Sequence, residues 1–296
     1  MFKALNAIIE NEINESNLDF YTVIIGTKPS QGARSPKLWN RAYEYEQKRI
    51  RMVPLDVRED KLEQVFNYLK EDKQCLGGAV AVPYKEKIFN LIKENVEEEI
   101  RAIGAVNCFH RPTNGSLINE FTGTNTDGEA ALEPIRQQLI ESNNLTIGLL
   151  GFGGAGKAIL AFLLRDFEER HKVCLFNRNL IHTKDAKKNE LYSYTFNDLD
   201  TLLPHIDLLI NATSVGHVES IHKTPVPAKL LAKAKKNLVV YDIIYDPIKT
   251  TLLKDSEEKG LKTINGLRMN LIQAVLAYSY TNPTRLAKEE IYKIMS

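Results

Sequence analysis

The chain has 296 residues, a formal net charge of +1 and 26% charged residues. This length suits two domains of ordinary size, and the balanced charge indicates no broad basic surface for nucleic acid. Its three cysteines have no paired spacing, which argues against a disulfide framework and against a metal site. No apolar run is long enough to span a membrane, and the N-terminal apolar run is too short for a signal peptide. We therefore expect a cytoplasmic protein.

Predicted strands and helices alternate in the first half of the chain. Ser35 can cap a helix and Pro36 suits its first turn, so a helix is expected to begin there. Residues 1–18 are expected to add one helix in front of the first strand. The other predictions are strands at residues 21–25, 49–53 and 76–82, helices at 35–47 and 58–70, and a hairpin formed by 105–110 and 116–121 that turns at 113–115.

The alternation continues in the second half. A helix over residues 128–141 is expected to lead from one domain into the next. Because strands alternate with helices, we predict an α/β protein whose parallel sheet has helices on both faces. The predicted elements are strands at residues 145–150, 172–176, 206–211, 238–243 and 261–264, and helices at 155–170, 250–259, 267–280 and 286–295.

A glycine-rich turn separates the strand at 145–150 from the helix that follows it. Its candidate cofactor-binding residues are Gly151, Gly153, Gly154, Ala155 and Gly156. Glycines let the backbone turn sharply and approach a pyrophosphate, and the helix N-terminus favours an anion. The alternative is a tight strand-to-helix turn that binds no ligand.

The end of the next strand indicates which dinucleotide is bound. Proteins that bind NAD usually carry an acid there for the ribose 2′-hydroxyl, whereas this chain has Asn177 and Arg178. Arg178 could pair with a 2′-phosphate through its planar donor fork, so NADP is favoured and NAD stays possible. The alternative for Arg178 is a solvated surface arginine.

Two polar residues of the first half are candidates for proton transfer. Lys85 follows a predicted strand and a proline, where its side chain could project into a cleft and act as a general acid–base. Asp127 lies in a polar turn at the start of the connecting helix, where an acid can also be a simple helix cap. A lysine–aspartate pair facing a nicotinamide needs no metal for this chemistry.

These segments together resemble the shikimate dehydrogenase family, including its quinate-using relatives. The resemblance covers nearly everything from Tyr21 to the C-terminus, with the motifs in the expected order. The motifs are SP at 35–36, VPYKE at 82–86, AVN at 105–107, NTDG at 125–128, GFGGAG at 151–156, NR at 177–178, NATS at 211–214, YDIIYDP at 241–247 and INGLRMNLIQA at 264–274.

The resemblance implies a substrate-binding domain at residues 1–127, completed by 267–296, and a Rossmann NADP-binding domain at 128–266. It implies reversible NADP-linked reduction of 3-dehydroshikimate to shikimate, a step towards chorismate and the aromatic amino acids. The partner would be a small-molecule substrate, and the protein a monomer or homodimer. Residues carried over from the family are the catalytic pair Lys85 and Asp127, the substrate-binding Ser35, Asn107, Tyr245 and Gln273, and the cofactor-binding Asn177, Arg178, Thr213 and Ser214.

The pocket for the substrate carboxylate departs from the family's pattern. Ala33, Ala79 and Ala81 stand where the family usually carries a serine, an asparagine and a threonine. A hydrogen bond to a charged group contributes about 1.5–3 kcal/mol, so these losses could reduce affinity unless Ser30, Gln31 or Arg34 compensates. Two alternatives therefore stay open: a dehydrogenase for quinate or another hydroxylated ring, and an NADP-binding regulatory protein with little catalysis.

Overall fold

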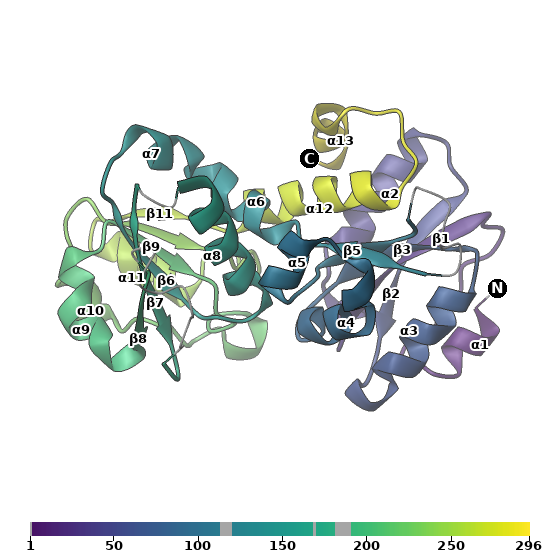
Figure 1. Cartoon of the computed structure of the whole chain (residues 1–296), viewed down its shortest axis with the longest axis horizontal. Coiled ribbons are helices and arrows are strands. Elements are labelled where there is room, and N and C mark those ends of the chain that lie inside the picture. Colours follow the sequence, from purple (N-terminus) through teal and green to yellow (C-terminus); the bar gives the residue numbers. More distant parts are fainter. Residues whose placement is uncertain (1, 113–119, 168–169, 181–190) are drawn as a thin grey trace. The chain divides into compact units, whose positions relative to one another are not determined.

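In the computed structural model the chain divides into two compact units, which are described for residues 2–112, 120–167, 170–180 and 191–296. Unit 1 comprises Met1–Thr126 and Leu271–Ser296, and unit 2 comprises Asp127–Asn270. Each unit has a sheet flanked by helices (Figure 1), so the predicted α/β class is confirmed. The chain thus leaves unit 1 after Thr126 and returns to it at Leu271.

Unit 1 is built on a five-stranded mixed sheet of order β2-β1-β3-β4-β5. The first three strands are parallel, and β4 pairs antiparallel with both β3 and β5. On its outer side β4 pairs with residues 122–124, whereas the predicted turn at 113–115 and residues 116–119 of the predicted second strand lie outside the described residues. The strands are β1 (Phe20–Gly26), β2 (Ile50–Asp56), β3 (Cys75–Val80), β4 (Cys108–His110) and β5 (Thr122–Thr124).

Helices cover both faces of this sheet because alternate strand residues point to opposite sides. On one side Phe109 of β4 packs against Phe66 of α3, with ring centroids 5.1 Å apart. On the other side the neighbouring Cys108 joins an apolar cluster with Trp39 of α2 and Val275 of α12. The helices of unit 1 are α1 (Lys3–Asn6), α2 (Ser35–Tyr45), α3 (Leu62–Glu71), α4 (Lys85–Ile92), α5 (Glu98–Ile103), α12 (Leu267–Thr281, which begins in unit 2) and α13 (Lys288–Met295).

The C-terminal helices complete the core of unit 1. Trp39 and Tyr278 are fully buried and meet edge to face at 5.5 Å, and the indole N–H of Trp39 donates to the carbonyl of Ala274 at 3.1 Å. Since Trp39 and Ala274 are 235 residues apart in the chain, this contact forms only when the end of the chain packs on α2.

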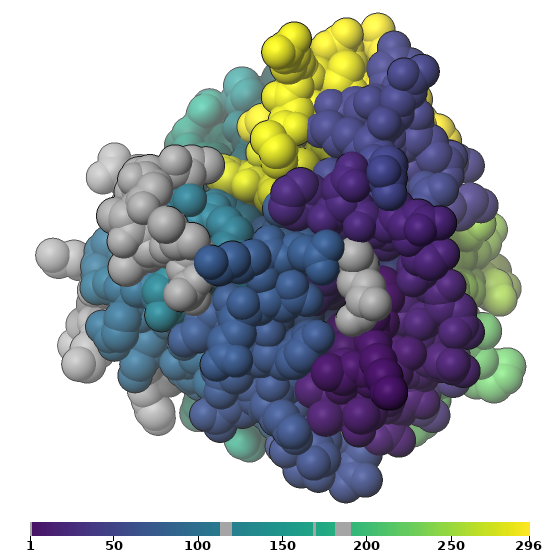
Figure 2. Space-filling model, turned by 90° about the vertical axis from the view of Figure 1, so that its right-hand side faces the viewer, coloured from purple at the N-terminus to yellow at the C-terminus, as the bar shows by residue number. Residues whose placement is uncertain are grey.

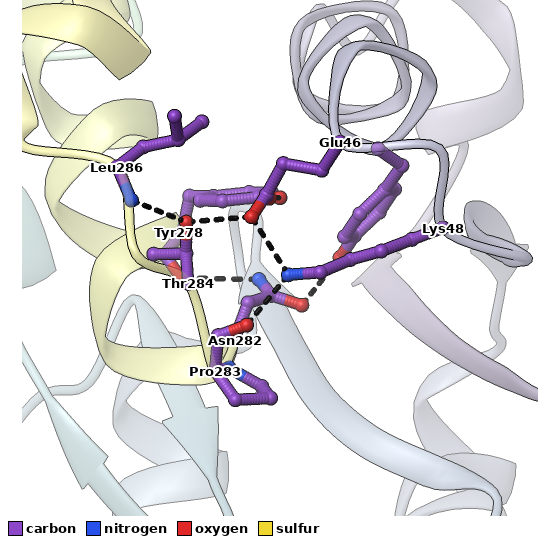
Figure 3. Close-up of polar contacts among 8 residues, drawn as sticks. Glu46, Lys48, Tyr278, Asn282, Pro283, Thr284 and Leu286 are labelled. Carbon is purple, nitrogen blue, oxygen red and sulfur yellow. Dashed lines mark hydrogen bonds and ion pairs between the residues drawn. The ribbon is translucent and has the colours of Figure 1, made fainter.

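A polar cluster joins the end of α2 to the segment after α12 (Figure 3). At its centre the Glu46 carboxylate accepts the hydroxyl of Tyr278 at 2.5 Å and that of Thr284 at 2.8 Å, and it pairs with Lys48 at 3.0 Å. Lys48 also donates to the carbonyl of Pro283. Burial alone would raise the pKa of Glu46, but the hydrogen bonds from Tyr278, Lys48 and Thr284 hold it below its ordinary value.

Glu46→Gln is expected to lower the free energy of unfolding by about 1–3 kcal/mol at pH 7, because bonds to an ionised carboxylate are lost. Since the folded pKa of Glu46 is lowered, its contribution is present above the ordinary pKa of 4.5 and is lost as the pH falls below it. Urea unfolding at pH 7 and near pH 4 should therefore show a gap between wild type and variant that shrinks in acid. Glu44→Gln, on an exposed carboxylate paired with Arg51, is the control and should change little.

Unit 2 has a six-stranded parallel sheet of order β11-β10-β9-β6-β7-β8. Read from β6 as the first strand, this is the order 3-2-1-4-5-6, in which a ligand crevice opens where the order reverses between β6 and β9. The edge strand β8 has no counterpart among the sequence predictions. The strands are β6 (Thr146–Leu150), β7 (Lys172–Asn177), β8 (Leu191–Thr195), β9 (Leu208–Asn211), β10 (Val239–Asp242) and β11 (Lys262–Ile264).

The helix predicted over 128–141 is not continuous. It forms α6 (Asp127–Leu132), a 3-10 turn (Glu133–Ile135) and α7 (Arg136–Glu141). Pro134 lies in the turn and has no N–H to donate, which accounts for the interruption. The other helices of unit 2 are α8 (Gly154–Phe167), α9 (Leu199–Leu202), α10 (Ala228–Leu231) and α11 (Thr251–Glu258); of the helix predicted at 155–170, residues 168–169 lie outside the described residues.

Candidate active site

Lys85 lies at the carboxyl end of the sheet in unit 1. It is the first residue of α4, five residues after the end of β3 and beyond the turn through Pro83, and its side chain is half-buried. The carbonyl of Lys85 accepts the N–H of Val106 at 3.1 Å, which ties the start of α4 to the segment that leads to Asn107. Lys85 and Asn107 thus lie on segments that are bonded to each other.

Asn107 and Gln273 are connected through Thr126, a residue that the sequence analysis did not single out. The Asn107 amide oxygen accepts the Thr126 N–H at 2.8 Å, and the amide nitrogen donates to the Thr126 hydroxyl at 2.9 Å. The same hydroxyl lies 3.1 Å from the carbonyl of Gln273. Both Asn107 and Thr126 are 2% exposed, so the amide of Asn107 has a fixed orientation. Thr126 is also the last residue of unit 1 before Asp127.

The three alanines that replace polar residues of the family pattern pack into the apolar cluster of unit 1. Ala79 belongs to that cluster, and Ala33 and Ala81 pack against it. Ser35, the first residue of α2, is 6% exposed. Ser30, one of the three residues that could compensate for a lost polar group, donates its own hydroxyl to Asp56.

Three of the four glycines in the glycine turn of unit 2 have different surroundings. Gly151 has a φ of +92° and donates its N–H to Phe176 of β7 at 2.8 Å. At Gly156 a Cβ would stand 2.3 Å from the carbonyl oxygen of Gly151, so only glycine lets α8 pack this closely on the turn. At Gly153 a Cβ would meet nothing within 4 Å. The exposed backbone at Gly153, before Gly154 and Ala155 open α8, is where a phosphate could approach.

The loop after β9 meets this turn at the point where the strand order reverses. A Cβ on Gly151 would lie 2.8 Å from the Thr213 methyl group, so the two loops are in contact. The Thr213 hydroxyl donates to Asn211 at 2.7 Å and accepts the N–H of Val215, which shapes the loop. Ser214 is exposed beside it. Both residues lie where a ligand crevice is expected in this strand order.

Asn177 ends β7 on the other side of the glycine turn, and Arg178 follows it directly. The Asn177 amide donates to the carbonyl of Asn179 at 3.3 Å, and the Arg178 side chain is exposed. Arg178 is therefore accessible to a phosphate in solution.

Asp127 and Tyr245 belong to unit 2. Asp127 begins α6 and is 4% exposed. The next residue, Gly128, has no room for a side chain, because a Cβ would lie 2.7 Å from the carbonyl of Ala158 in α8. Tyr245 is half-buried in the segment after β10. Lys85 and Asp127, the pair expected to move the proton, therefore come from different units.

The segment that carries Tyr245 is held by the buried carboxylate of Asp242. Asp242 accepts hydrogen bonds from Asn211 at 3.0 Å, the N–H of Ile244 at 3.1 Å and the hydroxyl of Thr250 at 2.7 Å. Burial raises the pKa of Asp242 to about 6, although these bonds oppose the shift.

Asp242→Asn is expected to reveal this raised pKa as a pH dependence of stability. Between the ordinary pKa of 3.8 and about 6, the folded protein binds more protons at Asp242 than the unfolded chain does. The free energy of unfolding of wild type should therefore fall relative to the variant as the pH rises through this window, by about 3 kcal/mol, and the difference should be constant above it. Denaturant unfolding from pH 4 to pH 8 measures the difference, and parallel curves would contradict the prediction.

The described residues hold no group of three or more histidine, cysteine or acidic side chains that could bind a metal ion. Cys75, Cys108 and Cys174 are buried, and none is bonded to another cysteine. Burial raises the pKa of the Cys75 and Cys108 thiols to about 12, so neither is a reactive thiolate.

The strand order and glycine turn of unit 2 define a dinucleotide-binding fold of the Rossmann class. A family model described as the shikimate dehydrogenase substrate binding domain matches residues 24–109 in unit 1. The chain is 32% identical to a shikimate dehydrogenase (NADP(+)) of Carboxydothermus hydrogenoformans, over 91% of this chain and 95% of that one. It is 29% identical to the enzyme of that name from Methanococcus vannielii, over 94% of this chain and 99% of that one.

A solved structure agrees with these matches. The crystal structure of shikimate dehydrogenase from Aquifex aeolicus superposes with a TM-score of 0.76 at 28% identity, and covers 95% of this chain and 99% of that chain. The chain belongs to the shikimate dehydrogenase family.

Proposed function

We propose that this protein catalyses the reversible, NADP-linked reduction of 3-dehydroshikimate to shikimate. The observation that carries the proposal is the extent of the similarity. A relative named shikimate dehydrogenase (NADP(+)) matches over 95% of its own length, and the match covers 91% of this chain and so includes both units. The reaction belongs to the pathway that leads to chorismate and the aromatic amino acids.

Lys85 is the proposed acid–base of the reaction. When bound, NADPH supplies the hydride that reduces the carbonyl carbon of the substrate. Lys85 donates the proton that converts the carbonyl oxygen to a hydroxyl, and it takes that proton back in the reverse direction. Asp127 is proposed to orient Lys85 and to stabilise its charged form.

Substrate positioning is proposed for the four residues that the family resemblance identifies. Thr126 holds the Asn107 amide through both its oxygen and its nitrogen, and Asn107 in this fixed orientation is proposed to bond a substrate oxygen. Ser35, Tyr245 and Gln273 are proposed to contact the remaining polar groups of the ring. Thr213 and Ser214 are proposed to lie beside the cofactor with the glycine turn.

Arg178→Ala is expected to raise the KM for NADP⁺ about tenfold and to leave the KM for NAD⁺ within about twofold. The reason is that a charge-assisted hydrogen bond to the 2′-phosphate is lost, whereas NAD⁺ has no such group. Steady-state assays with each cofactor measure the change. Equal effects on both cofactors would place Arg178 outside the 2′-phosphate site.

A second candidate substrate is favoured by the alanines at positions 33, 79 and 81. They give the pocket fewer polar groups than the family pattern, so quinate or another hydroxylated ring could be the better substrate. The test is an assay of the purified protein with shikimate and quinate, each with NADP⁺ and NAD⁺. Turnover of shikimate with NADP⁺ is the expected result. No turnover of shikimate at millimolar concentration would refute the first proposal, and preferred turnover of quinate would establish the second.

We further propose that the protein works in the cytoplasm on small molecules, as a monomer or homodimer and without nucleic acid. None of the helices in the described part of the chain is long and apolar enough to cross a membrane.

A further inference from the structure

The loop between β1 and α2 is anchored at its middle by a buried carboxylate. Asp56 is the last residue of β2 and is 5% exposed. Its carboxylate accepts the backbone N–H of Ser30 at 2.9 Å and the Ser30 hydroxyl at 2.5 Å. Asp56 also pairs with Gly26, the last residue of β1, in the parallel ladder. The carboxylate thus lies at the edge of the sheet from which the loop leads to Ser35.

Apolar packing also holds the end of this loop, where Ala33 lies against the apolar cluster of unit 1. Ser30 is exposed, and within the loop Pro29 is the buried residue. Two further hydrogen bonds of the loop are local turns, from Gln31 to Lys28 and from Ala33 to Pro29. The paired bonds between Asp56 and Ser30 therefore fix the middle of the loop relative to β2.

The N-terminal segment fixes Asp56 from its other side. The backbone N–H of Asp56 donates to the Asn11 side chain at 2.7 Å, and its carbonyl accepts the N–H of Glu10 at 2.8 Å. The Asn11 amide also donates to the carbonyl of Pro54 at 3.0 Å. Because β2 is the edge strand of the sheet, these bonds satisfy groups that would otherwise face solvent.

The N-terminal segment is itself held by apolar packing. Phe2 meets Tyr21 of β1 edge to face with centroids 4.9 Å apart. Leu5, Ile9 and Ile13 are buried, and the Asn6 side chain bonds both the N–H and the carbonyl of Ile13. Figure 2 shows that residues from the start of the chain, in purple, cover a broad part of one face of the molecule beside the blue of α3. The support for Asp56 is therefore a packed element.

We propose that Asp56 is a positioning residue of the substrate site: it holds the loop at residues 27–34, and through it Ser35, in place. A buried carboxylate that only filled space would be less favourable than an apolar side chain of the same volume. The two hydrogen bonds from Ser30 to Asp56 therefore indicate that Asp56 orients the loop. The inference rests on the proposed function, because Ser35 is taken to contact the ring substrate. It also gives the residues before β1 a role in the site.

The test uses three variants: Asp56→Asn, Ser30→Ala and the double variant that combines them. The control is Asp60→Asn, which changes an exposed aspartate paired with Arg58. Each single variant is expected to raise the KM for shikimate about fivefold to twentyfold, and to leave kcat and the KM for NADP⁺ within about twofold. The double variant should be no worse than the worse single variant, because both changes remove one link. Hydrogen exchange of the amides at 27–34 should be about tenfold faster in Asp56→Asn and unchanged in Asp60→Asn.

Each outcome decides a separate step. Unchanged exchange at 27–34 in Asp56→Asn would refute the anchor, and faster exchange with an unchanged KM would refute the link to the substrate. Multiplicative effects in the double variant would show that Asp56 does not act through Ser30. If Asp56→Asn does not fold, the same KM and hydrogen-exchange measurements on Ser30→Ala decide, because Ser30 is exposed. Failure of wild type to turn over shikimate would refute the proposed function and the link to its substrate, while exchange would still decide the anchor.

Discussion

Lys85→Met is expected to lower kcat by about 10²–10⁴-fold, the usual contribution of a positioned acid–base. The KM for NADP⁺ should change by no more than about twofold, since Lys85 lies in unit 1 and the glycine turn in unit 2. Methionine is an unbranched side chain close to lysine in length, and it lacks the ammonium group. Steady-state and single-turnover assays with shikimate measure the loss.

The matched control is Lys87→Met, two residues along α4, where the lysine pairs with Glu59 at the surface. It should retain nearly full activity. If both variants lose activity equally, the effect arises from α4 as a whole. If Lys85→Met retains full kcat, Lys85 is not the acid–base.

Gly156→Ala is expected to lower the stability of unit 2, whereas Gly153→Ala is expected to weaken the binding of NADPH. At Gly156 the new methyl group would stand 2.3 Å from the carbonyl oxygen of Gly151, so unit 2 should lose about 2–4 kcal/mol of stability with or without cofactor. At Gly153 the methyl group would meet nothing within 4 Å, so stability without cofactor should be unchanged. There the methyl group would instead occupy space needed by the phosphates, and the Kd for NADPH should rise about tenfold.

Thermal unfolding with and without NADPH, together with a direct binding titration, distinguishes the two glycines. Normal NADPH affinity in Gly153→Ala would show that the phosphates do not pass over this part of the turn. An unaltered unfolding temperature in Gly156→Ala would show that α8 can shift away from the turn at little cost.

The strands of both sheets were largely predictable because buried parallel strands are continuous apolar runs. Residues 145–150 and 172–176 differ from β6 and β7 by one residue at one end. The edge strand β8 was not predicted, because its sequence LYSYT has neither an apolar run nor a strict alternation of apolar and polar residues. Most of its residues are only partly buried in the structure. The N-terminal residues were expected to form a helix, and only Lys3–Asn6 does so before the chain extends towards the edge of β2.

The supporting residues of the candidate site were beyond prediction for a different reason. Thr126 and Asp56 act through side-chain bonds to partners 19 and 26 residues away, and the hydroxyl of Thr126 reaches a carbonyl 147 residues away. Such pairings depend on strand order and on the return of the chain to unit 1. A motif identifies Asn107 or Ser35 and says nothing of what holds them.

The insertion of unit 2 within unit 1 affects how the protein is made on the ribosome. The surface of α2 that receives Ala274 and Tyr278 is translated long before residues 271–296. At about 5–20 residues per second, the wait after Thr126 is roughly 10–30 s. During that time the residues of α12 that pack on Trp39 and Tyr43 have not been made. The nascent chain therefore exposes an apolar surface that a chaperone could bind. Loss of the last helices by premature termination would make this exposure permanent.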